Sequence, residues 1–173
     1  MISLLSFGPD GWGRLILSAT LTTLLLSFAA LLVGAVVGSG VAAAKLSPHR
    51  AVRWLGEGYS VIFRGIPELL VIYLLYFGGS ALITQIGQLF GADGFIEAPP
   101  FLIGALAIGL ISGSYQAEVY RAARLALAKG EIEAAVAIGM PRWRIRQRIL
   151  LPQVARYALP GLSNVWQMSL KDS

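Results

Sequence analysis

The chain has 173 residues, of which 56% are hydrophobic and only 13% are charged. Ordinary soluble domains carry about 25% charged residues, so this composition excludes a water-soluble domain, and it also excludes a disordered chain. The net charge is +5, yet the mean hydropathy of +0.70 indicates lipid rather than nucleic acid as the surroundings. The absence of cysteine and the single histidine, His49, exclude disulfides, thiolate sites and multi-histidine metal sites.

The first membrane span is predicted over residues 15–44, which carry no charge. A helix needs roughly 20 apolar residues to cross the hydrocarbon core, and this stretch is longer than that. A secretory signal would have a shorter apolar region behind a basic start, whereas only Arg14 precedes this one. We therefore expect the segment to remain in the mature protein.

Later uncharged stretches predict the other spans. Residues 69–92 are uncharged and indicate a second span over about 55–90, with a kink or a charged gate near Pro67. Residues 98–117 indicate a third span over about 98–120. The last uncharged stretch is too short for a full crossing, so residues 155–173 are predicted to be only the start of a fourth span.

Orientation follows from the lysines and arginines. All of them except Arg14 and Lys171 lie at the facing ends of the first two spans or after the third. The loop 93–97 carries acids and no base. Because basic residues concentrate on the cytoplasmic side, we expect that loop and the N-terminus outside and the polar region after span three inside.

Small-residue pairs at four-residue spacing occur within the predicted spans. This spacing lets helix backbones approach closely, but so many glycines also produce such pairs by chance. Close helix crossings and ordinary membrane-helix glycine both remain open for the pairs Gly34 to Gly38, Gly87 to Gly91 and Gly109 to Gly113.

The polar region from Glu118 to Arg156 is rich in alanine and predicts helices. Glu131 and Glu133 follow Gly130, where acids offset the dipole of a helix start. Gly139 followed by Pro141 indicates that one helix ends and another begins. We therefore expect a helix, a tight turn and a second helix, forming a hairpin in the cytoplasm.

The second helix of that hairpin has an ambiguous pattern. Arg142, Arg144, Arg146 and Arg148 alternate with other residues, which is the periodicity of a strand. A helix is still favoured, because the chain offers no partner strand and the arginines then pair along the helix surface. A solvated basic face near anionic lipid headgroups is an equally open interpretation of the arginines themselves.

One spacing in this region resembles the EAA signature of ABC importer permeases. Its seven positions are Glu133, Ala134, Ala135, Gly139, Ile149, Leu151 and Pro152. Three further segments are similar to the polar amino acid branch of that family: Arg64 to Pro67, Tyr115 to Arg121 and Tyr157 to Gly161. The histidine, basic amino acid and opine permeases are the most similar, partly because Glu68 follows the proline.

The resemblance implies an all-α membrane protein with the type I ABC importer transmembrane fold. Residues 121–152 would be the coupling loop that docks into a cleft of a cytoplasmic ATPase dimer. Within it Glu133 would contact that cleft, Ala134 and Ala135 would allow close approach, and Gly139 would permit the sharp turn. Leu151 and Pro152 would define where the next span begins. Local helix architecture alone is the alternative for each.

Five residues are candidates for the substrate path or its gate: Arg64, Pro67, Glu68, Lys171 and Asp172. An ionisable group at membrane depth is costly and usually has a use. Glu68 would bind a cationic substrate or form a gate pair with Arg64, and a structural ion pair is equally open. Lys171 and Asp172 would line the path or pair with each other. Glu118 and Arg121 are predicted to be a structural pair.

The resemblance implies a transport subunit that is not an enzyme and needs no cofactor. No Walker A motif is present, so ATP would be hydrolysed by another chain. The implied partners are an ATPase dimer, a second permease subunit or another copy of this chain, an external solute-binding protein, an amino acid and membrane lipid, in a bacterial inner membrane. A nucleic-acid partner is not expected.

Two other classes of function are weighed against transport. A membrane adaptor or assembly protein would recruit a partner through the basic loop, but it has no reason to preserve the EAA spacing. An intramembrane enzyme lacks support, because His49 stands alone and no metalloprotease or nucleophile motif occurs.

The chain is a single domain over residues 1–173, and relatives in this branch continue past the position of Ser173 to complete the fourth span and add a final one. We therefore expect a fragment, a truncated reading frame or a non-functional permease.

Overall fold

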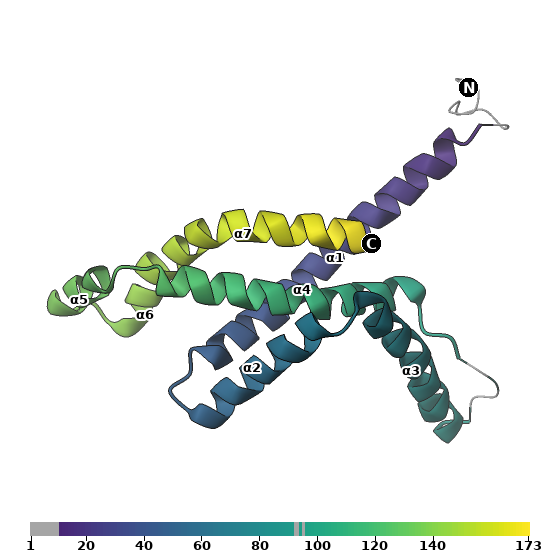
Figure 1. The fold of residues 1–173 in the computed structure, drawn as a ribbon, viewed down its shortest axis with the longest axis horizontal. Coiled ribbons are helices and arrows are strands. Elements are labelled where there is room, and N and C mark those ends of the chain that lie inside the picture. Colours follow the sequence, from purple (N-terminus) through teal and green to yellow (C-terminus); the bar gives the residue numbers. More distant parts are fainter. Residues whose placement is uncertain (1–10, 92–93, 95) are drawn as a thin grey trace.

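The computed structural model describes residues 11–91, 94 and 96–173, and these ranges contain helices and no strand. The expected all-α fold is thereby confirmed. Figure 1 shows how the elements are arranged. In chain order they are α1 (Gly13–Lys45), α2 (Arg50–Gly65), α3 (Glu68–Leu89), α4 (Pro100–Leu125), α5 (Lys129–Ala137), α6 (Arg142–Ile145), the π-helical turn η2 (Arg146–Leu150) and α7 (Leu151–Asp172).

Three of these helices, α1, α3 and α4, are long and apolar enough to cross a membrane. Most of their large apolar side chains are exposed, as expected for helices whose outer surfaces face lipid tails. The chain is thus a multi-pass membrane protein with three complete spans, and α7 contains the region predicted to begin a fourth.

The segment 55–90, predicted to be one span with a kink, is instead two helices. Helix α2 ends at Gly65, and α3 begins at Glu68. Between them Ile66 is extended, with φ −93° and ψ 135°. Pro67 explains the break, because its ring disfavours helical geometry in the preceding residue and it has no N–H to continue the hydrogen-bond ladder.

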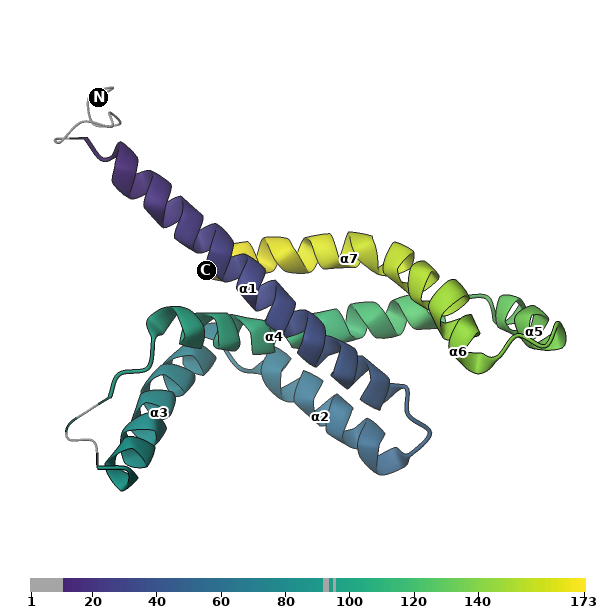
Figure 2. The same cartoon turned by 180° about the vertical axis from the view of Figure 1, so that it is seen from behind.

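Helices α1 and α4 cross closely, as the two opposite views show (Figures 1 and 2). A Cβ atom added at Gly38 would lie 2.8 Å from the carbonyl oxygen of Gly113, and one added at Gly109 would lie 2.6 Å from Val33 Cγ1. The glycine pairs of these two helices therefore bring the backbones together. The third pair does not act this way, because Gly91 lies beyond the end of α3 with a φ of 86°.

The crossing also contains a paired polar side chain. Gln116 is buried, and its Nε2 donates to the carbonyl oxygen of Leu31 at 3.1 Å. Its Oε1 accepts a hydrogen bond from the Tyr120 hydroxyl at 2.9 Å. Since lipid offers no hydrogen bonds, these partners remove the cost of burying the amide. The α1–α4 pair is the scaffold on which α2 and α7 pack.

Candidate functional site

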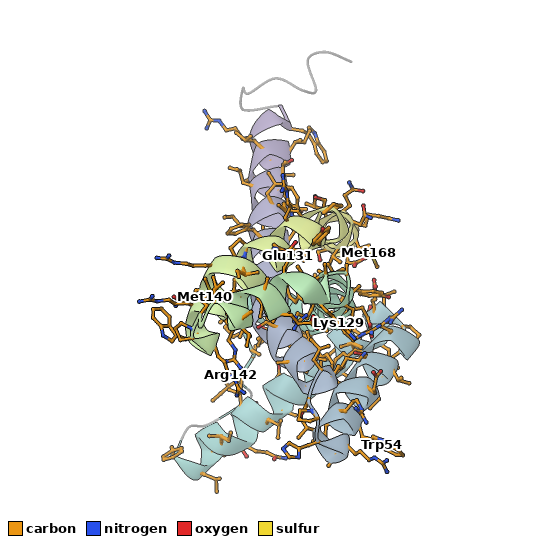
Figure 3. The ribbon with its side chains drawn as sticks, turned by 90° about the vertical axis from the view of Figure 1, so that its left-hand side faces the viewer. Trp54, Lys129, Glu131, Met140, Arg142 and Met168 are labelled. Atoms are coloured by element: carbon orange, nitrogen blue, oxygen red, sulfur yellow. The ribbon has the colours of Figure 1, made fainter. Side chains whose placement is uncertain are left out.

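The EAA hairpin, residues 129–145, lies beyond the end of α4 and consists of α5, a turn and α6 (Figure 1). Figure 3 looks onto this end of the molecule, where Lys129, Glu131, Met140 and Arg142 are labelled. Glu133 and Ala134 are exposed, whereas Ala135 is only 4% exposed. The two alanines of the motif thus differ: Ala134 is open to a partner and Ala135 packs within the chain.

The turn of the EAA hairpin has the geometry expected from its glycine. Gly139 has a φ of 75°, a left-handed conformation that L-residues with a Cβ rarely adopt. The N–H of Met140 donates to the carbonyl oxygen of Ala135 at 3.0 Å, and the N–H of Gly139 donates to that of Val136 at 2.9 Å. These two bonds form a Schellman motif, which satisfies the last carbonyls of α5 and ends the helix.

The four arginines after Pro141 lie in a helix, as favoured, and not in a strand. They are exposed along α6 and η2, while Ile145 among them is 4% exposed. The N–H of Leu151 donates to the carbonyl oxygen of Arg146, five residues earlier. Ile149 lies half-buried in this wide turn, and Leu151 and Pro152 begin α7. Pro152 lacks an N–H, so the helix starts where that donor is not needed.

A second group of polar residues lies at the meeting point of α1, α2 and α4; we call Lys45, Glu57, Ser60, Arg64, Glu118 and Arg121 the Lys45 cluster. The side chain of Lys45 is 1% exposed. Its Nζ lies 3.0 Å from Glu57 Oε2 and 3.1 Å from Ser60 Oγ, and it also contacts Glu118 Oε1. One buried ammonium therefore joins three helices.

Gly56 allows this arrangement. A Cβ atom there would lie 2.8 Å from Lys45 Cγ. Because glycine has no side chain, α2 packs directly over the end of α1, and its carboxylate at Glu57 reaches the lysine.

Arg64, a predicted path residue, belongs to this cluster and not to a pair with Glu68. Its Nη1 lies 3.8 Å from Glu118 Oε1, and its Cζ lies 5.5 Å from the centre of the Tyr115 ring. Among the described residues no ion pair joins Arg64 to Glu68. The gate pair is therefore absent from this structure, because the break at Pro67 separates the two side chains onto different helices.

The pair predicted on α4 is present. Arg121 Nε lies 2.9 Å from Glu118 Oε2, one helical turn away. Beside it, an open pocket of about 370 Å³ is lined by Glu57, Ser60, Val61, Arg64, Gly65, Tyr115 and Glu118.

Glu68 meets another candidate residue. Glu68 at the start of α3 and Asp172 at the end of α7 line one small cavity, together with Ser112 and Tyr115 of α4. Pro67 immediately precedes α3, and its carbonyl oxygen accepts hydrogen bonds from the first turn. The fold thus brings together two carboxylates that are more than a hundred residues apart in sequence.

Lys171 and Asp172 do not form an ion pair within the described ranges. Neighbouring helix residues point about 100° apart, so the side chains diverge. Lys171 is exposed, while Asp172 turns toward the cavity with Glu68.

Sequence reasoning missed the joining roles of Lys45 and Glu57. Lys45 follows the long uncharged stretch of α1, and as a basic residue it indicated only which side of the membrane that end of the span faces. A signal was available, because Lys45, Glu57 and Glu118 all lie toward the predicted cytoplasmic ends of their helices. As for metals, no group of three or more His, Asp and Glu side chains suited to an ion occurs in residues 11–91, 94 and 96–173.

Comparisons with known proteins agree on one family. Residues 37–173 match the family model described as binding-protein-dependent transport system inner membrane component. An octopine transport system permease protein of Rhizobium radiobacter is 54% identical over 170 residues, covering 98% of this chain and 72% of the relative. A nopaline transport system permease protein of Agrobacterium fabrum is 47% identical over 173 residues, covering 99% and 73%.

More distant matches have the same character. A histidine/lysine/arginine/ornithine transport system permease protein of Escherichia coli is 36% identical over 163 residues, covering 94% of this chain and 71% of the relative. A solved structure of an amino acid ABC transporter with histidines matches with a TM-score of 0.73 and 29% identity, covering 92% of this chain and 69% of that one. The chain belongs to the binding-protein-dependent transport inner membrane components, in the branch of polar amino acid ABC transporter permeases.

Proposed function

We propose that the chain is the permease subunit of an ATP-driven importer for a basic or opine-like amino acid, with ATP hydrolysed by separate cytoplasmic subunits. The observation that carries this proposal is that α7 follows the exposed EAA hairpin after the turn η2 and ends at Asp172 beside Glu68. A site for an ATPase and a site for a substrate are in this way connected through η2 and α7.

The EAA hairpin has the surface of a docking site. Ile138 is 77% exposed, Val136 58% and Trp143 57%, next to the exposed carboxylate of Glu133. Apolar side chains exposed on an otherwise polar loop mark an interaction surface, and an aromatic residue with a nearby charge is typical of interface hot spots. Glu133 would contact the ATPase cleft, and Ala134 would allow its close approach.

The substrate path is proposed to include Glu68 and Asp172. Two carboxylates that line the same cavity repel each other unless a cation or a proton lies between them. The cavity has no room for a water molecule in this structure, so we propose that it widens when a substrate ammonium or guanidinium group enters and supplies that charge. The relatives named for octopine, nopaline and histidine/lysine/arginine/ornithine transport support a substrate of this class.

The charge distribution supports an orientation with the EAA hairpin in the cytoplasm and the N-terminus outside. A solute-binding protein would deliver substrate from outside, and a second permease subunit or a second copy of this chain would complete the path. The membrane would be the inner membrane of a bacterium.

The test is Glu133→Lys in the complete complex reconstituted in liposomes. We expect the ATPase to detach and uptake of radiolabelled arginine or octopine to fall at least about tenfold, because a reversed charge faces the partner's cleft. Gln147→Lys is the matched control, since Gln147 is exposed on the same polar segment. Unchanged ATPase attachment and uptake in Glu133→Lys would contradict the proposal.

A further inference from the structure

Helix α5 has few attachments to the rest of the chain. It has nine residues, and Ala135 is the one among them that is buried. A helix of this length is not stable in isolation, so its position depends on the contacts it makes. Apart from its covalent connections, the orientation of α5 depends on the packing of Ala135 and on side chains of neighbouring elements that contact it.

One side-chain hydrogen bond reaches α5 from another element in the described part of the chain. Gln153 Nε2, in the first turn of α7, donates to Glu131 Oε2, in the first turn of α5. The bond is charge-assisted, so it is stronger than one between neutral groups. It joins two residues that are 22 positions apart in sequence, and the segment between them includes the Gly139 turn and η2.

Glu131 and Glu133 face different directions. Two residues apart, they lie about 200° apart around a helix. Glu131 faces the start of α7, and Glu133 is free for a partner. The lysine and the glutamate at the start of α5 are labelled in Figure 3. The two acids of the hairpin thus have separate surroundings and are open to separate tests.

We propose that Glu131 and Gln153 are positioning residues that hold α5 against α7, so that displacement of the EAA hairpin moves α7 directly. This inference rests on the proposed function, in which the hairpin is where the ATPase pushes. Without the bond, displacement passes through the packing of Ala135, the Gly139 turn, where the residue lacks a Cβ, and the wide turn η2. The two turns would absorb part of the motion before it reaches Asp172.

The experiment measures substrate molecules imported per ATP hydrolysed by the complete complex in liposomes, with radiolabelled arginine and octopine as probes. Gln153→Glu places two carboxylates together, and Glu131→Ala removes the acceptor. We expect each to lower that ratio about fivefold, the effect of losing one typical intramolecular hydrogen bond, while the ATPase stays attached. Gln153 is half-buried, whereas Glu131 is exposed, so Glu131→Ala gives the same reading if Gln153→Glu does not assemble.

The double variant Glu131→Gln with Gln153→Glu restores the bond with donor and acceptor exchanged. We expect it to return the import ratio to within about twofold of the parent, a rescue that a merely structural or surface-charge effect would not produce. Arg156→Gln is the control, since it alters charge on α7 within one turn of Gln153, and Arg156 is exposed and makes no ion pair within the described ranges.

The outcomes separate the two proposals. An unchanged import ratio in Gln153→Glu and Glu131→Ala, with Glu133→Lys still inactive, would overturn the positioning role and leave the permease function standing. The positioning role would also be overturned if the double variant Glu131→Gln with Gln153→Glu did not restore the import ratio. Full activity in Glu133→Lys would overturn both.

Discussion

The Lys45 cluster and the EAA hairpin are both rich in charge, yet they are built in opposite ways. In the cluster, Lys45 on α1 and Glu118 on α4 are 73 residues apart and meet in the interior. In the hairpin and the turn η2 that follows it, Glu133 and four arginines lie close in sequence and remain exposed. The Lys45 cluster pairs its charges within the chain, whereas the hairpin leaves its charged side chains exposed and available to a partner protein.

The difference reflects where each site can obtain a partner. No buried side-chain nitrogen or oxygen in the described residues lacks a hydrogen-bond partner, because unpaired polar groups in the interior are costly. Exposed groups have water as a partner and can exchange it for a protein. Internal pairing therefore marks a structural joint, whereas the exposed charge beside exposed Trp143 belongs to the surface that we propose for docking.

The largest effect is expected on the buried side of this comparison. Lys45→Ala leaves Glu57 and Glu118 without their shared ammonium. Because both carboxylates are partly exposed, we expect the loss of about 1.5–3 kcal/mol that accompanies removal of a hydrogen bond to a charged group. Thermal unfolding of the purified complex in detergent measures the loss. Arg142→Ala, on the exposed hairpin, is the control and should unfold at nearly the parent temperature. Equal stability of both variants would show that the cluster is not a joint.

An intermediate effect is expected at the turn of the hairpin. Gly139→Ala forces a residue with a Cβ into a left-handed conformation at about 1–2 kcal/mol. The cost is local, so we expect uptake to fall several-fold while the unfolding temperature of the complex changes little. Gly130→Ala is the matched control, because a Cβ there meets no atom within 4 Å and its φ is not left-handed. Identical uptake by the two variants would contradict the role of the turn.

The smallest effect is expected at the edge of the cluster. Arg121 pairs with Glu118 one turn away, but its side chain is 36% exposed. Surface ion pairs contribute about 0.2–1 kcal/mol, so Arg121→Gln should lower the unfolding temperature slightly, and high salt should erase the difference. A loss as large as that of Lys45→Ala would place Arg121 inside the joint.

Much of the hairpin was predictable from sequence because its signals are local. The left-handed Gly139 and the helix start after Pro141 follow from the chemistry of those residues, whatever the rest of the chain does. The helical state of the arginines was predicted against their strand-like alternation, on the argument that no partner strand exists. The roles of these residues toward an ATPase remain proposals.

The cluster and the break at Pro67 were harder to predict. A proline near the start of a span indicated a kink, but whether a helix bends or ends there depends on whether neighbours satisfy the freed backbone groups. In the sequence, Lys45 indicates the orientation of the first span in the membrane. It does not indicate the partners of Lys45, because the crossing of α1 against α4 determines which side chains meet. Arg64 meets Glu118 and not Glu68, because the break at Pro67 places Arg64 and Glu68 on different helices.

Composition, uncharged stretches and one motif are enough to define a helical membrane protein of the amino acid permease class, because hydrophobic length and turn chemistry act over short distances. The choice of partners across helices needed the assembled fold. In the folded chain, two of the three glycine pairs lie at the crossing of α1 and α4, and Lys45 connects three helices. Asp172 lies beside Glu68. Close packing selects among many possible pairings, and that selection depends on the relative placement of whole helices, which no local pattern contains.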